Sequence, residues 1–333
     1  MIHSSLPINL ATAAVSADEQ KYIDILQSAE ASRKDKADAC RLLSRCATEA
    51  SVEPLAALLD NEELAHMARY GLETIDSPKV NEVLRAALGK VKGRLLAGVI
   101  GSLGVRKDAG SVEAMIPLLK DADPIVAQAA ARALGSIGTR EAVQALMRAV
   151  DQVAPASHLA FCEGLFRAAE RAAASDEKRV ADRIYQKLLS QTGPHQVRTG
   201  AFRGLVLVRG NAAIPLILLA LNGTDFGLVQ AAALVIQELP GSAVIQSVAA
   251  ELAAMPAEKQ ILLVQTFAER ADLAALSAVM KVAEQGEKAA RIAAIQALPA
   301  FQNKNVVPVL EKQAQDGDAE IAEAAKFALA AMS

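Results

Sequence analysis

The sequence has little of several residue types on which common classes of protein depend. It has no tryptophan, and aromatic residues make up 3% of its 333 residues. Enzymes that extrude a base from DNA hold it on aromatic side chains, so this scarcity argues against a DNA glycosylase. With 35 basic and 38 acidic residues, a net charge of -3, the chain also lacks the cationic surplus of a phosphate-backbone binder.

Cysteine and histidine are too few and too scattered to build a disulfide framework or a metal site. Cys40 and Cys46 are expected on different faces of one helix, Cys162 lies far along the chain, and no C-x-x-C motif occurs. H-E-x-x-H is absent too, and no histidine is followed by glutamate. The histidines are His3, His66, His158 and His195. We therefore predict no metal and no cofactor.

Motifs of common catalytic sites are also absent. The sequence contains neither a G-x-x-x-x-G-K-[ST] phosphate loop nor a G-x-S-x-G nucleophile motif. Its close acidic pairs, Glu62 with Glu63 and Asp121 with Asp123, stand where helices are expected to begin, and carboxylates there complement the helix dipole. The sequence thus predicts a protein that is not an enzyme.

Long hydrophobic runs are missing as well. The longest, Ala212 to Leu221, is interrupted by Pro215 and is too short to cross a bilayer, so we predict no membrane span. Residues 1–17 contain no Lys or Arg, although Val15-Ser16-Ala17 has the small residues of a signal-peptidase site. We interpret residues 1–17 as an N-terminal tail or the remnant of an export signal.

What the chain does contain is an internal repeat. Residues 51–60 and 111–120 place their apolar side chains at the same positions, and each forms the stripe of a short amphipathic helix. An alanine-rich second helix that ends near a leucine follows, as in residues 129–135, 290–298 and 324–329. This pattern predicts about ten helical hairpins, which begin near residues 19, 51, 79, 110, 140, 175, 211, 241, 272 and 304.

Such hairpins predict an all-α fold, because one hairpin cannot bury both of its apolar stripes but stacked neighbours can. We expect one continuous α-solenoid over residues 18–333, since no linker separates two halves. The expected helix starts are Pro78, Pro124, Pro155, Pro194 and Pro256, the expected N-caps are Thr139, Asn211 and Asn305, and the expected helix ends are Gly104, Gly135 and Gly138.

The repeat resembles the HEAT repeat in its short bacterial, PBS-lyase-type form. Ala133-Leu134-Gly135-Ser136-Ile137-Gly138 matches the ending of that unit, and Leu103-Gly104 matches it in part. The proline common in the first HEAT helix corresponds to Pro54, Pro117, Pro215 and Pro308. The resemblance implies an armadillo-type right-handed superhelix, an architecture that serves many functions.

The repeats are also similar to the HEAT segments of large exported bacterial proteins. Residues 65–70, 99–106 and 160–165 carry this similarity, whereas the catalytic and haem domains joined to those segments have no counterpart here. The similarity implies a binding or scaffolding part. It also implies an exported or periplasmic protein, or a cytoplasmic one if the N-terminal segment is no signal.

Several second helices carry a cation or an amide two or three residues before the terminal leucine. These residues are Arg69, Arg132, Arg203, Gln296 and Lys326. At that spacing they point away from the core, and in HEAT stacks the second helices line the concave face. We predict a non-enzymatic scaffold that binds a protein or peptide, with acidic segments, through this face. The alternatives are a docking or regulatory module of an associated enzyme, and a HEAT-like lyase.

Overall fold

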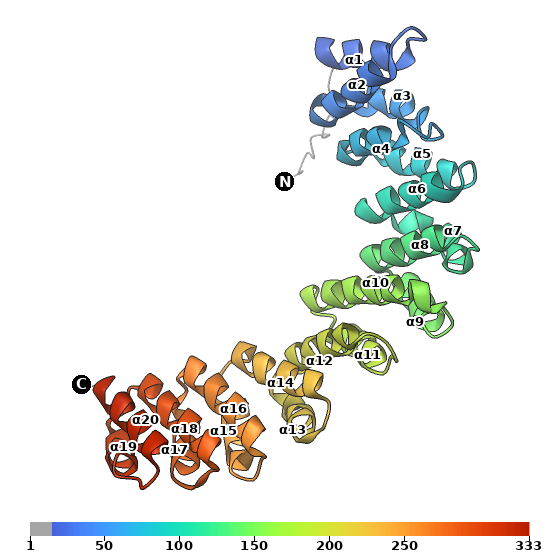
Figure 1. The fold of residues 1–333 in the computed structure, drawn as a ribbon. Coiled ribbons are helices and arrows are strands. Elements are labelled where there is room, and N and C mark those ends of the chain that lie inside the picture. The colour runs from blue at the N-terminus through green and yellow to red at the C-terminus, as the bar shows by residue number, and fades with distance from the viewer. Residues whose placement is uncertain (1–14, 333) are drawn as a thin grey trace, which may run out of the picture. The chain divides into compact units, whose positions relative to one another are not determined.

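The computed structural model describes residues 15–332, in which all regular structure is helical and no strand occurs (Figure 1). The prediction of an all-α solenoid is confirmed. The predicted tail of residues 1–17 falls mostly on residues 1–14, and these, with His3, lie outside the described residues.

The helices pair into hairpins in two compact units, of which unit 1 ends at Arg171 and unit 2 begins at Ala172. Unit 1 contains α1 (Ala17–Gln27), α2 (Arg33–Cys46), α3 (Val52–Ala56), α4 (Ala65–Thr74), α5 (Pro78–Leu88), α6 (Gly93–Val105), α7 (Val112–Met115), α8 (Pro124–Ile137), α9 (Arg140–Ala149) and most of α10 (Pro155–Ala174). Unit 2 contains α11 (Lys178–Leu189), α12 (His195–Arg209), α13 (Ile214–Asn222), α14 (Phe226–Glu238), α15 (Ala243–Leu252), α16 (Ala257–Arg270), α17 (Leu276–Gln285), α18 (Lys288–Ala297), α19 (Val307–Gln313) and α20 (Ala319–Ala330).

Each predicted hairpin corresponds to one observed pair of helices. Within each unit the odd-numbered helices form one layer and the even-numbered helices another, which we call the first-helix layer and the second-helix layer (Figure 1). The single domain predicted for residues 18–333 stays a prediction.

The sequence identifies most of the helix boundaries. Pro78 and Pro124 occupy the first turns of α5 and α8, and Thr139 caps α9 by accepting a hydrogen bond from the Ala142 backbone. The prediction is wrong for two asparagines. Asn211 and Asn305 lie inside the 3-10 turns Gly210–Ala213 and Lys304–Val306 and are not N-caps. Each of these turns continues directly into the following helix, α13 or α19.

The core is built from aliphatic side chains and alanine. Leu134 is completely buried, as its place in the repeat predicts, and so are the rings of Phe161 and Phe267. Cys40 and Cys162 are buried free thiols that act as small apolar side chains. With so few rings, the stability of the fold depends on close contact between helices.

Three glycines in the second-helix layer of unit 1 allow that contact. A Cβ on Gly104 of α6 would lie 2.8 Å from the Cα of Ala133, and one on Gly135 of α8 would lie 2.0 Å from the carbonyl oxygen of Gly164 on α10. Neither Gly104 nor Gly135 caps its helix as predicted. Gly104 is the last residue but one of α6, Gly135 lies three residues before the Gly138 cap of α8, and both stand at helix crossings. Gly138, with φ of 66°, does end α8.

Arginines near the C-terminal ends of second helices bind carbonyls at the C-terminal end of the second helix before them. Arg270 at the end of α16 donates to the carbonyls of Ile236 (2.6 Å), Leu239 (2.7 Å) and Gly241, where α14 ends. Arg106, directly after α6, does the same for Glu73 in the last turn of α4 and for Ile75 and Ser77 that follow α4, and Arg171 does so for Ser136 and Ile137 at the end of α8. A cation thus satisfies carbonyls that the preceding helix leaves without partners.

The stretch from His195 to Asn222 is long and apolar enough, by length and composition, to cross a membrane. It is not one straight helix, because Gly210, with φ of 58°, separates α12 from α13. Three arginines of α12 also pair with acidic residues of unit 2, namely Arg198 with Asp225, Arg203 with Glu238 and Arg209 with Asp182. These features explain the stretch as two helices of stacked repeats.

Gly104→Ala is expected to destabilise unit 1 by about 1–3 kcal/mol, because the new methyl group overlaps the backbone of α8. Gly101→Ala on the same helix is the matched control. A Cβ at Gly101 meets nothing within 4 Å, so that variant gains about 0.5–1 kcal/mol from helix propensity. Urea denaturation followed by circular dichroism measures both, and equal midpoints for the two variants would contradict the proposed contact.

Arg270→Lys is expected to cost about 1–2 kcal/mol, because one ammonium group cannot reproduce a guanidinium shared among three carbonyls. Arg148→Lys, at an exposed position on α9, serves as the control and leaves stability unchanged. The thermal unfolding midpoint is the measurement. A loss no larger for Arg270→Lys than for Arg148→Lys would show that the carbonyl contacts add nothing.

Candidate functional site

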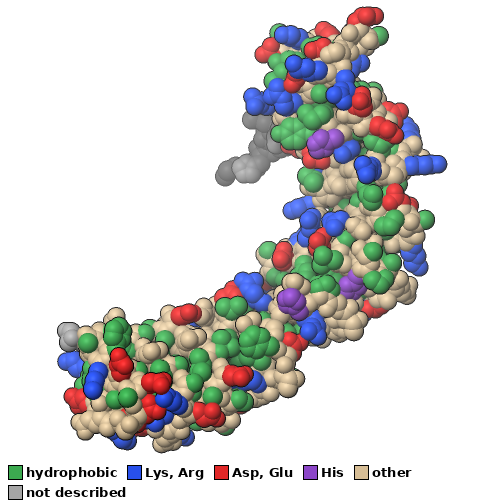
Figure 2. Space-filling view, in the orientation of Figure 1, with side chains coloured by type: hydrophobic (Ala, Val, Ile, Leu, Met, Phe, Trp, Pro, Cys, Tyr) green, Lys and Arg blue, Asp and Glu red, His purple; other side chains and the backbone are tan. Residues whose placement is uncertain are grey.

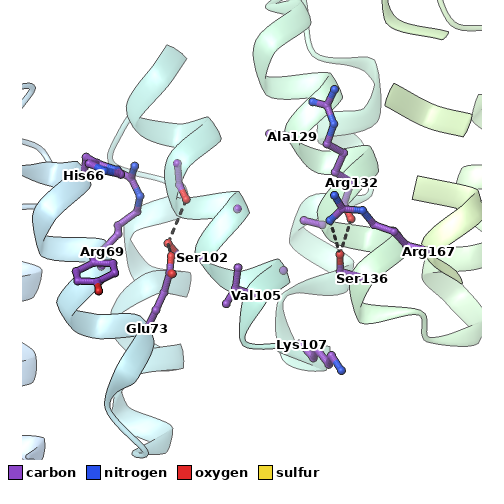
Figure 3. Close-up of a pocket in the computed structure, with 15 residues that line it drawn as sticks. His66, Arg69, Glu73, Ser102, Val105, Lys107, Ala129, Arg132, Ser136 and Arg167 are labelled. Atoms are coloured by element: carbon purple, nitrogen blue, oxygen red, sulfur yellow. Dashed lines mark hydrogen bonds between the residues drawn. The ribbon is translucent and has the colours of Figure 1, made fainter. Parts of the chain in front are cut away.

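A groove of about 580 Å³ crosses the second-helix layer of unit 1. It runs over α4, α6 and α8 to Arg167 of α10, so successive repeats contribute one helix each (Figure 3). Its polar lining residues are His66, Arg69, Glu73, Ser102, Lys107, Arg132, Ser136 and Arg167. Four of these are cations and one is a carboxylate, although the chain as a whole is slightly acidic.

This charge is local. Over the face shown in Figure 2, basic and acidic side chains are interspersed without an extended area of one sign. The groove therefore offers a few cations at defined places. It suits a short acidic segment better than a long polyanion, which needs a continuous basic surface.

Two of the groove arginines are already engaged. The Nε of Arg132 donates to the carboxylate of Glu163 on α10 at 2.6 Å, and both side chains are about two-fifths exposed. Arg167 donates to the hydroxyl of Ser136 at 3.2 Å, and Figure 3 shows its guanidinium at that residue. These contacts join α8 to α10 and leave only part of each guanidinium for a ligand.

Arg69 differs from both. Its half-buried side chain leaves α4 and lies against the backbone of α6, where a Cβ on Gly98 would come 2.2 Å from the Arg69 Cζ. Burial lowers the pKa of Arg69, and the nearby Glu73 carboxylate partly opposes that shift. Glu73 itself accepts a hydrogen bond from the Ser102 hydroxyl at 2.7 Å (Figure 3). Among residues 15–332, no hydrogen bond or ion pair engages the Arg69 guanidinium.

The groove also has an apolar part that sequence reasoning missed. Tyr70 is 50% exposed and Val105 is 64% exposed, and both line the groove. Tyr70 directly follows Arg69 on α4, so an aromatic residue beside an outward-facing arginine was the available signal. Cations next to exposed apolar side chains suit a partner segment that carries both carboxylates and apolar groups.

The structure places all five predicted binding residues on second helices. Arg69 and Arg132 share the groove of unit 1, whereas Arg203, Gln296 and Lys326 lie exposed on α12, α18 and α20 of unit 2. The carboxylate of Glu238 on α14 binds Arg203, with 2.7 Å between its Oε1 and the arginine Nε.

Lys326 is followed by Phe327, which is 77% exposed. The proposed ladder across the repeats remains a prediction.

No catalytic arrangement emerges in the described part of the chain. It holds no group of three His, Cys, Asp or Glu side chains that could bind a metal. His158 lies 3.7 Å from the sulfur of Cys162, measured from its Nδ1, but burial raises the pKa of that thiol to about 11. A thiol of this kind is not an activated nucleophile at neutral pH.

Comparison with known proteins agrees with this architecture. Residues 87–156, which run from the end of α5 to the start of α10, match the family model described as HEAT repeats. The chain contains HEAT repeats. They include the crossings at Gly104 and Gly135, and the motif from Ala133 to Gly138 on which the resemblance was based.

Solved structures of HEAT solenoid type share this fold. A chain in the structure describing Kap95p binding to RanGDP superposes with a TM-score of 0.54 at 12% identity, covering 94% of this chain and 50% of that one. A chain of the Kap95–Nup1 complex gives 0.54 at 12% identity, with 94% and 51% covered, and a Kap121p mutant gives 0.50 at 11%, with 99% and 42% covered. This chain thus spans about two-fifths to one-half of the length of these three solved chains.

No curated protein sequence matches the chain. At identities near 12% the structural similarity establishes the fold alone. The chain is an all-helical repeat solenoid, and the prediction that it resembles exported bacterial proteins stays a prediction.

The buried cysteines give a test of the core. Burial raises the pKa of Cys40 to about 11, as it does for Cys162, so both thiols stay protonated at pH 8. We expect only the half-buried Cys46 to react with a thiol reagent at that pH in the native protein, and all three cysteines to react in urea. Absorbance of the released thiolate counts the reacted groups. Three rapid equivalents in the native state would contradict the described packing.

Proposed function

We propose that this chain is a non-enzymatic scaffold which binds an acidic segment of a protein partner through the groove of unit 1. The observation that carries the proposal is the composition of the groove. Arg69, Lys107, Arg132 and Arg167 come from successive repeats and line the groove together with the exposed side chains of Tyr70 and Val105. A guanidinium pairs bidentately with a carboxylate, and the apolar surface beside it adds affinity for a neighbouring apolar side chain.

Two further facts support a peptide ligand. The groove is open and crosses several helices, as a binding surface for an extended segment does. The described residues also hold no group of three His, Cys, Asp or Glu side chains that could bind a metal ion. The matched solved structures include Kap95p with RanGDP and Kap95 with Nup1. Solenoid surfaces of this architecture are therefore able to hold protein partners.

A set of labelled nine-residue peptides tests the proposal. One peptide alternates glutamate with leucine, and two others replace each glutamate by glutamine or lysine. Fluorescence anisotropy with the full chain is expected to show preferential binding of the Glu/Leu peptide, weakening as salt is raised because exposed charges are screened. Equal binding of all three peptides, or preference for the lysine peptide, would overturn the proposal.

Charge reversal then locates the binding site. Arg132→Glu combined with Arg167→Glu is expected to weaken Glu/Leu binding at least about tenfold, because two attractive charges become repulsive. The matched control is Arg140→Glu combined with Arg148→Glu, which reverses two exposed arginines of α9 in the first-helix layer. Circular dichroism establishes that both variants are folded. An equal effect of the two double variants would place binding elsewhere.

A further inference from the structure

The cations of the groove differ in what they do within the folded chain. Arg132 is bound to Glu163 and Arg167 to Ser136, so both contribute to the packing of α8 against α10. Lys107 is exposed and ends a helical turn with φ of 52°. Arg69 is half-buried, and its guanidinium donates no hydrogen bond within the described residues. It is therefore the groove cation with the least evident structural purpose.

The position of Arg69 has a specific cause. Its side chain occupies the space between α4 and α6, and the absence of a Cβ at Gly98 leaves room for the guanidinium against the α6 backbone. The nearest described carboxylate on its own helix, Glu73, is turned to Ser102. The absence of a Cβ at Gly98 thus gives the guanidinium a place on α6, where no described residue accepts a hydrogen bond from it.

The partial burial of this unpaired charge is expected to lower the stability of the free protein. Moving a guanidinium partly out of water without a paired anion is unfavourable, and the lowered pKa of Arg69 has the same cause. Residues that destabilise a fold while they face an open groove are characteristic of binding sites, where the ligand supplies the missing partner. Because the group is already oriented and partly desolvated, a carboxylate that reaches it loses little further freedom.

We infer that Arg69 is the anchor of the groove and binds a single glutamate or aspartate side chain of the partner segment, while Tyr70 contacts an apolar neighbour of that residue. The inference rests on the proposed function and deepens it by naming the residue that selects the carboxylate. Arg132 and Arg167 then act mainly as parts of the groove wall, and their contribution to affinity is electrostatic and screened by salt.

The first test needs no ligand. Arg69→Met keeps most of the apolar stem and removes the charge, so the thermal unfolding midpoint of the full chain is expected to rise. Arg132→Met is the matched comparison, and it is expected to leave the midpoint unchanged or lower it, because Glu163 loses its partner. A lower midpoint for Arg69→Met would show that the guanidinium is a structural element of the fold and would overturn the inference.

The second test uses the labelled Glu/Leu peptide. Arg69→Met is expected to weaken its binding at least about tenfold, the effect of losing a charge-assisted pair. Arg148→Met, which removes an exposed charge from α9, is expected to leave binding unchanged. Gly98→Ala is a second variant that retains the arginine, and its methyl group displaces the guanidinium and weakens binding without loss of the fold.

The outcomes separate the two proposals. If the native chain binds the Glu/Leu peptide preferentially and Arg69→Met binds it equally well, Arg69 is not the anchor and the proposed function stands. If the native chain shows no preference for the Glu/Leu peptide, the proposed function fails, and the anchor fails with it. Loss of binding in both Arg69→Met and Gly98→Ala, with unchanged binding in Arg148→Met, supports both.

Discussion

The structure of unit 1 depends on the close approach of α6, α8 and α10, which is possible only because side chains are missing where these helices cross. Gly104 meets Ala133, and Gly135 and Gly164 bring α8 and α10 together with no room for a Cβ on either. A chain with so few aromatic residues needs such contacts, since dispersion between closely packed backbones replaces the large buried rings of other cores. The glycine crossings therefore determine where each second helix presents its polar side chains.

In the groove, glycines at helix crossings have two different roles. Between α6 and α8 a glycine allows one helix to touch another, whereas between α4 and α6 Gly98 allows a side chain, Arg69, to lie against the backbone. The same residue type thus serves tight packing at one interface and a charged group at the next. Arginines at helix ends, such as Arg106, hold neighbouring repeats together by binding carbonyls at and just after the end of the preceding second helix.

The hairpins, their order and the burial of Leu134 could be predicted from the sequence, because apolar periodicity is a local property of 10–15 residues. The roles of Gly104 and Gly135 could not be predicted from the sequence. A glycine near a helix end is equally consistent with a helix terminus and with a close contact between two helices. The pairs Arg132 with Glu163 and Arg203 with Glu238 join residues 31 and 35 positions apart. Such pairs depend on how repeats stack, which periodicity within one helix does not specify.

The central claim is that the second-helix layer of unit 1 binds an acidic segment at Arg69. Hydrogen–deuterium exchange of the full chain, with and without the Glu/Leu peptide, tests it most directly because it locates the contact without any substitution. The account predicts slower exchange in α4 and α6, over Ala65–Thr74 and Gly93–Val105, and unchanged exchange in α5 and α7 of the first-helix layer. Protection confined to the first-helix layer or to unit 2 would contradict it.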